Sequence, residues 1–230
     1  ELRNYLEDGF ALAKRQGNQG RALGFVMTIF QKIAASSFAA VRRTLRRRLL
    51  MLTLHEAVIR DRELGIDGRQ ALLDEAKQLI RDEDDLADDP VGRGRVDQIL
   101  ADLKLKVLKR LDESELEAVS DQYGSELGAA QAEDMAVMAV SLALPEERSR
   151  LRTLLGSWPP GRETKVEKLL HALGALWRQD PKEKVVIFAT YLGTVDLLEQ
   201  EIEAEYPGQG VVVLRRGDHG AKTAAERRFL

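Results

Sequence analysis

The stretch that decides the fold is "EKVVIFATYLGTVDLLEQEIEAEYPGQGVVVLRR", residues 183–216. It begins with a short apolar run rich in β-branched residues, 183–189, and it ends with a second such run, 210–216. Runs of this kind are typical of strands that are buried in a parallel sheet. Between them, residues 194–206 have the pattern of an amphipathic helix, with Thr194 as a candidate N-cap. Strand, helix and strand with short connections predict a βαβ unit in a parallel α/β sheet.

Helical periodicity dominates the chain before this stretch. Within residues 18–64, apolar residues recur near helical spacing at Val41, Leu45, Leu49, Leu52 and Val58. They recur again within 96–111, where charged residues occupy the opposite face. A third amphipathic pattern covers residues 164–180. The sequence therefore predicts a predominantly α-helical region that is followed by a partial α/β domain with a parallel sheet.

Charge divides the chain into segments of opposite sign. Residues 1–60 carry 11 Lys and Arg against 4 Asp and Glu, whereas residues 61–150 carry 12 against 23. A polyanion would attract the first segment and repel the second. With the helical pattern, this predicts a basic helical connector (1–64), an acidic helical insertion (65–160) and the beginning of the α/β domain (161–230).

Composition excludes several classes of protein. The chain contains no cysteine, so disulfide frameworks and thiolate metal sites are excluded. No apolar run approaches the roughly 18 residues of a membrane span, and we expect a cytoplasmic protein. Glu1 is not an initiator, the first methionine is Met27, and a basic helix has barely begun where the chain stops at Leu230. We therefore interpret the chain as a piece of a longer protein.

Three stretches carry a resemblance when they are taken in order. They are "GFVMTIFQKIAASSFAAVRRTLRRRL" (24–49), "TKVEKLLHALGAL" with "KVVIFATYLGTVDLLEQEI" (164–176 and 184–202), and "GDHGAKTAAERRF" (217–229). Together they resemble the Swi/Snf-type branch of superfamily-two helicases, which are ATP-driven nucleic-acid translocases. The first stretch is similar to the segment that follows the first RecA-like lobe. The other two are similar to the opening strands and helices of the second RecA-like lobe, so the resemblance implies a truncated RecA-like domain.

The resemblance also implies cofactors and partners. In this family ATP and Mg²⁺ bind to elements outside the region matched here. The chain itself has no G-x-x-x-x-G-K-[ST] loop to cradle phosphates and no Asp-Glu pair after a buried strand to hold Mg²⁺. We expect the parent protein to hydrolyse ATP and this chain alone not to do so. The implied partners are nucleic acid, DNA rather than RNA, and the missing first RecA-like lobe.

Two groups of residues are candidates for contacts with the nucleic-acid backbone. Thr190 and Thr194 lie where the first predicted strand gives way to a helix, a position at which α/β proteins bind phosphates. The alternative is that Thr194 only caps its helix and Thr190 only shapes the turn. The second group lies in the glycine-rich turn and basic helix near the end of the chain, where a solvated helix face is the alternative: Gly217, His219, Gly220, Lys222 and Arg227, with Arg228 adding charge.

A cluster of arginines marks the basic connector. Arg42, Arg43, Arg46 and Arg47 occupy neighbouring positions of one predicted helix. They are suited to bind the phosphates of a duplex backbone, or to pair with the carboxylates of the acidic insertion. The acidic run 82–85 lacks the spacing of a calcium loop, and we expect no metal site there.

These observations leave two functions open. The first is a fragment of an ATP-dependent nucleic-acid helicase or translocase that contributes backbone contacts and interlobe coupling. The second is a non-enzymatic helical module whose acidic insertion docks a protein partner. Salt-sensitive binding of nucleic acid separates the first from the second.

Overall fold

The structure, a computed structural model, describes residues 1–59, 61–84, 90–111, 128–214 and 223. The chain divides into two compact units. Unit 1 comprises residues 1–32 and 41–158, and unit 2 comprises residues 33–40 and 159–230. Two consecutive long helices are shared between the units. Residues 33–36 at the end of the first helix and residues 38–40 at the start of the second belong to unit 2, and the rest of each helix belongs to unit 1.

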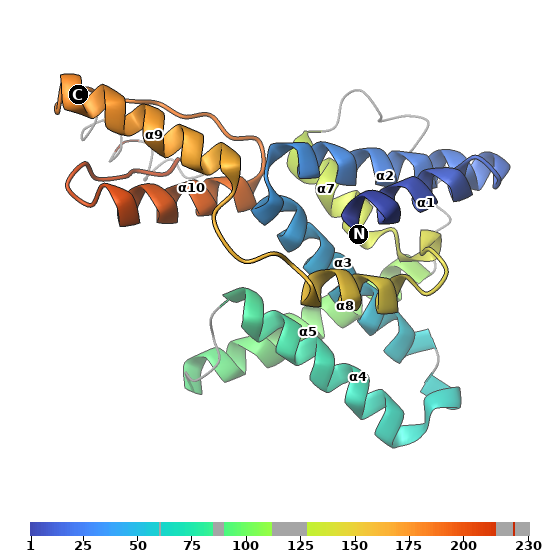
Figure 1. The fold of residues 1–230 in the computed structure, drawn as a ribbon. Coiled ribbons are helices and arrows are strands. Elements are labelled where there is room, and N and C mark those ends of the chain that lie inside the picture. The colour runs from blue at the N-terminus through green and yellow to red at the C-terminus, as the bar shows by residue number, and fades with distance from the viewer. Residues whose placement is uncertain (60, 85–89, 112–127, 215–222, 224–230) are drawn as a thin grey trace. The chain divides into compact units, whose positions relative to one another are not determined.

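The described residues of unit 1 form helices. They are α1 (Leu2–Ala13), most of α2 (Gly17–Ser36), most of α3 (Phe38–Ile59), α4 (Asp61–Asp84), α5 (Pro90–Leu111), α7 (Ala129–Met138), the 3-10 turn η1 (Val140–Leu142) and α8 (Glu147–Gly156) (Figure 1). None of the described helices combines the length and the hydropathy that a bilayer span requires.

The apolar stripe predicted within residues 18–64, from Val41 onward, lies on the buried face of α3. Val41, Leu45 and Leu49 are at most 3% exposed, so the helical spacing in the sequence corresponds to the core-facing side. Helix α1 approaches α2 closely at Gly9, where a Cβ would lie 2.2 Å from the Met27 sulfur. Any larger residue at position 9 would therefore force the buried Met27 side chain to shift.

A hairpin of α4 and α5 forms a further part of unit 1, and the two helices lie side by side (Figure 1). Near the start of α4 the chain kinks at Gly65, whose φ of 65° is open to glycine and strained for other residues. The glycines of "GIDG" at 65–68 predict the end of the preceding long helix; instead α3 ends at Ile59, and the "GIDG" sequence produces the kink within α4.

Unit 2 contains the helical hairpin of α9 (Thr164–Gln179) and α10 (Leu192–Glu205). Its small core joins Val166, Leu170 and Leu173 of α9 to Ile202 of α10. Tyr206 closes the end of this core, because its hydroxyl donates to the Leu170 carbonyl at 2.7 Å.

The predicted parallel sheet is wrong. The described residues form no β-strand, and segments 183–189 and 210–214 have no regular secondary structure. Val185 and Val211 pack on the α9–α10 core. Most of the other apolar residues of the two segments are exposed, namely Val186, Ile187, Phe188, Val212 and Leu214. The β-branched sequence favours an extended backbone, but a buried parallel strand also needs a hydrogen-bonded neighbour and cover on both faces.

Candidate functional site

The α2–α3 junction, residues 35–40, gathers the polar groups of unit 2. Helix α2 ends at Ser36 and α3 begins at Phe38, so Ser37 stands between them. The Ser37 hydroxyl accepts a hydrogen bond from the Ala40 N–H at 3.0 Å, which is the N-cap interaction that serine commonly makes. Of the Ser36-Ser37 pair, Ser37 therefore caps α3, whereas Ser36 is the last residue of α2; Ser37 itself is buried.

The start of α9 places two opposite charges on this junction. The Glu163 carboxylate accepts from the Ala39 N–H at 2.8 Å, at the N-terminus of α3. The Lys165 ammonium donates to the carbonyls of Ala35 and Ser36, the last two residues of α2. Each charge has the sign that the adjacent helix dipole favours, and such placements contribute about 0.3–1 kcal/mol each at exposed sites.

Helix α10 supplies the third side of the junction. The Thr194 hydroxyl lies 2.8 Å from the Ser37 hydroxyl and 3.1 Å from the Ser36 hydroxyl. Gly193 allows this approach, because a Cβ there would lie 2.8 Å from the Ala40 Cα. Two stretches that are far apart in the sequence therefore meet through hydroxyl groups and closely packed backbone.

The sequence-predicted phosphate contacts fall in different places. Thr190 is exposed in the bend before α10. Thr194 lies in the first turn of α10 without capping it, and its hydroxyl is engaged by the two serines. The remaining candidates lie outside the described residues: Gly217, His219, Gly220, Lys222, Arg227 and Arg228. Their contact with nucleic acid stays a prediction.

The arginines of the basic connector differ in their surroundings. Arg42 is exposed on α3, whereas Arg43 and Arg46 are half-buried. Arg47 pairs with Glu133 at 3.2 Å and with Asp134 at 2.5 Å. Both carboxylates belong to the segment named the acidic insertion, so this contact is of the intramolecular kind that the sequence left open.

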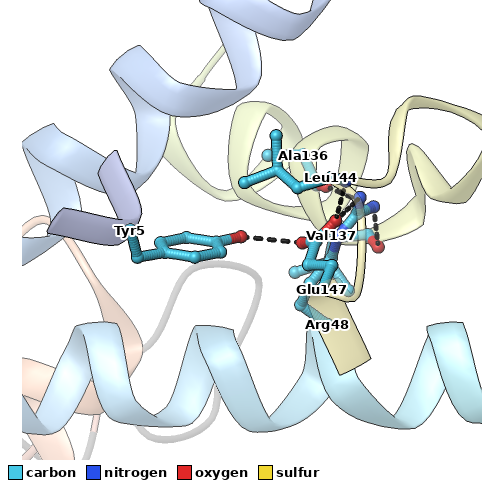
Figure 2. Close-up of polar contacts among 6 residues, drawn as sticks. All are labelled: Tyr5, Arg48, Ala136, Val137, Leu144 and Glu147. Carbon is cyan, nitrogen blue, oxygen red and sulfur yellow. Dashed lines mark hydrogen bonds and ion pairs between the residues drawn. The ribbon is translucent and has the colours of Figure 1, made fainter. Parts of the chain in front are cut away.

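Sequence reasoning missed Arg48, the neighbouring arginine at the centre of unit 1. Its side chain is fully buried, and its Nε and Nη2 donate to the Glu147 carboxylate at 3.0 and 3.1 Å. Its Nη1 reaches the carbonyls of Ala136 and Val137 at 3.4 and 3.3 Å (Figure 2). A signal was present, because position 48 lies two helical turns after Val41 and therefore on the buried stripe of α3.

Glu147 completes this buried network. It accepts from the Tyr5 hydroxyl and from the Leu144 N–H, each at 2.7 Å (Figure 2). Burial alone would raise the pKa of Glu147, but the Arg48 charge and these hydrogen bonds outweigh it and lower that pKa. Burial, reinforced by the Glu147 charge, raises the pKa of Tyr5 well above its ordinary value of 10.0. Since every polar group in it is matched, the network serves to hold α1, α3 and α8 together.

Burial and the Arg48 charge also lower the pKa of His55, two turns further along α3. A neutral imidazole is a metal ligand by type, yet the described residues hold no group of three His, Cys, Asp or Glu that would bind a metal ion. The acidic run at 82–85 contributes no described side chains to this search.

Comparison with known proteins gives no match. No protein-family model, no curated protein and no solved structure is significantly similar to this chain.

Proposed function

We propose that this chain is part of an ATP-driven nucleic-acid translocase of the Swi/Snf type. In it, the chain contributes contacts to the nucleic-acid backbone and couples two parts of the motor, while ATP and Mg²⁺ bind elsewhere in the parent protein. The proposal does not require a parallel sheet within this chain. On this account the protein works in the cytoplasm, on DNA rather than RNA.

One observation carries the proposal. The middle of the first stretch that bears the resemblance, residues 33–40 of 24–49, belongs to the same compact unit as residues 164–202, although residues 41–158 of unit 1 lie between them in sequence. They meet through Ser36, Ser37 and Thr194, and through Glu163 and Lys165 at the ends of α2 and α3. Polar contacts that join distant, motif-bearing stretches are what a coupling element needs, because motion of one stretch then acts on the other.

The test is the salt dependence of DNA binding by the whole chain. A fluorescein-labelled duplex is titrated with protein at several salt concentrations, and anisotropy gives the dissociation constant. Replacing Lys222, Arg227 and Arg228 with alanine should flatten the slope of log affinity against log salt by roughly 0.9 for each phosphate that the protein no longer neutralises. If all three side chains bind phosphates, the slope falls by about 2.7.

A charge-matched variant provides the control. Arg3, Lys14 and Arg95 are exposed cations of unit 1, and replacing them with alanine removes the same net charge. This variant should bind with nearly the parent slope, because its charges act only through the long-range field. Equal slopes for the two variants would remove the basic end of the chain from the footprint. Binding of a protein partner by the acidic insertion, without any DNA binding, would favour the helical interaction module instead.

A further inference from the structure

Only one local signal, the N-cap serine Ser37, marks the break between α2 and α3. The sequence across it is "AASSFAA", residues 34–40, which contains neither proline nor glycine. Alanine is the best helix former, and serine and phenylalanine cost only a fraction of a kcal/mol per residue. The local sequence is therefore compatible with one continuous helix, although the chain changes direction here (Figure 1).

The break leaves backbone groups that a continuous helix would pair with each other. In such a helix the Ala39 N–H would donate to the Ala35 carbonyl, and the Ala40 N–H to the Ser36 carbonyl. Here the Ala39 N–H donates to Glu163 and the Ala35 carbonyl accepts from Lys165. Both partners of one helical hydrogen bond are thus taken by two charged side chains that lie two residues apart.

The Ala40 N–H and the Ser36 carbonyl, which would also pair in a continuous helix, likewise bind side chains. The Ala40 N–H donates to the Ser37 hydroxyl, and the Ser36 carbonyl accepts from Lys165 at 3.3 Å. Thr194 holds the Ser37 hydroxyl in place from α10. The side chains from outside the junction that make these bonds, those of Glu163, Lys165 and Thr194, belong to the α9–α10 hairpin or to the residue before it. The hairpin therefore supplies hydrogen-bond partners for backbone groups that the break leaves unpaired.

We propose that the α2–α3 junction is a hinge with two states, and that the α9–α10 hairpin is its latch. With the hairpin docked, Glu163, Lys165 and Thr194 hold the helix broken. When the hairpin leaves, the freed donors and acceptors pair with each other, and α2 and α3 join into one helix at the expense of the contacts that their buried faces make within unit 1. This inference stands on the junction geometry and does not depend on the proposed function.

Distance measurement by electron spin resonance tests the hinge directly. The chain has no cysteine, so Gln31→Cys and Ile59→Cys introduce unique label sites on exposed positions of α2 and α3. A continuous helix would separate these positions by about 42 Å along its axis, from about 28 residues at roughly 1.5 Å each. Adding Glu163→Ala and Lys165→Ala should create a population near that distance that the parent lacks.

The control changes the same charges one turn further along α9. Glu167 and Lys168 are exposed there, and Glu167→Ala with Lys168→Ala should leave the distance distribution as in the parent. A single parent-like distribution in the Glu163/Lys165 variant would overturn the hinge. The same new population in the control variant would also overturn it, because the effect would then follow charge and not the junction contacts.

A second variant keeps the test decisive if the first does not fold. Gly193→Ala inserts a methyl group 2.8 Å from the Ala40 Cα and so wedges α10 away without removing any hydrogen-bonding group. It should produce the same long-distance population. Gly208→Ala is the matched control, since a Cβ there meets nothing within 4 Å. A parent-like distribution in the Gly193→Ala protein would count against the latch as strongly as it would in the charge variant.

Discussion

Replacing Arg48 with methionine should destabilise unit 1 severely. The substitution keeps a long, flexible side chain but removes every donor that Arg48 offers to the Glu147 carboxylate, which is 2% exposed. Glu147 would retain only its bonds from the Tyr5 hydroxyl and the Leu144 N–H. Removing one partner of a buried ion pair costs about 3–5 kcal/mol in free energy of unfolding. This is a large share of the roughly 5–15 kcal/mol that stabilises a typical domain.

The adjacent arginine supplies the comparison. The Arg47 side chain is 32% exposed, and it pairs with Glu133 and Asp134. Its replacement with methionine should cost at most about 1 kcal/mol, because solvent screens such pairs and the carboxylates can be hydrated. The two variants differ by one position on the same helix and remove the same charge.

Urea unfolding, followed by tryptophan fluorescence, measures both costs. Trp158 belongs to unit 1 and Trp177 to unit 2, so a Trp177→Phe background makes the signal report on unit 1. A further change, Glu147→Gln in the Arg48→Met protein, should recover part of the stability, because no unpaired charge then remains buried and the amide oxygen can still accept from the Tyr5 hydroxyl or the Leu144 N–H. Equal costs for the Arg47 and Arg48 variants, or no recovery in the double variant, would refute the assignment of Arg48 and Glu147 as the buried centre.

Two further predictions concern single groups. Because the folded-state pKa of Glu147 is lowered, the stabilisation from its ionised form is present above the unfolded value of 4.5 and is lost as pH falls through the folded value. Glu147→Gln should therefore reduce the acid-induced shift of the urea midpoint below pH 4.5, and an unchanged shift would contradict the pairing. Gly174→Ala should destabilise unit 2 despite the roughly 1 kcal/mol better helix propensity of alanine, since its Cβ would lie 2.4 Å from the Tyr206 hydroxyl oxygen. Trp177 fluorescence reports the change, and a stabilised protein would show that Tyr206 moves aside freely.

Local patterns predict the helices well. The stripe that includes Val41 and Leu45 is the buried face of α3, and the pattern at 164–180 matches α9 to within one residue. These predictions succeed because a 3.6-residue period reports directly which side of a helix lies in the core. The same reasoning fails at 183–189 and 210–214, because the sequence of a strand does not reveal whether a neighbouring strand pairs with it.

The candidate site is harder to predict. The sequence suggests a cap or a phosphate ligand at Thr194, yet its hydroxyl meets Ser36 and Ser37, which lie 158 and 157 residues earlier in the chain. No local pattern reveals a partner so distant. Arg48 is hidden for another reason: in a run of five arginines within seven residues, charge suggests exposure, and only the helical phase marks position 48 as buried.

The most direct test of the proposed function is a DNA-binding titration of the whole chain at about 50 and 200 mM salt. The account predicts binding to a labelled duplex that weakens steeply as salt rises. With three phosphates neutralised, the dissociation constant should increase about 40-fold over this range. The absence of measurable binding at the lower salt concentration, or an affinity that salt leaves unchanged, would contradict the account.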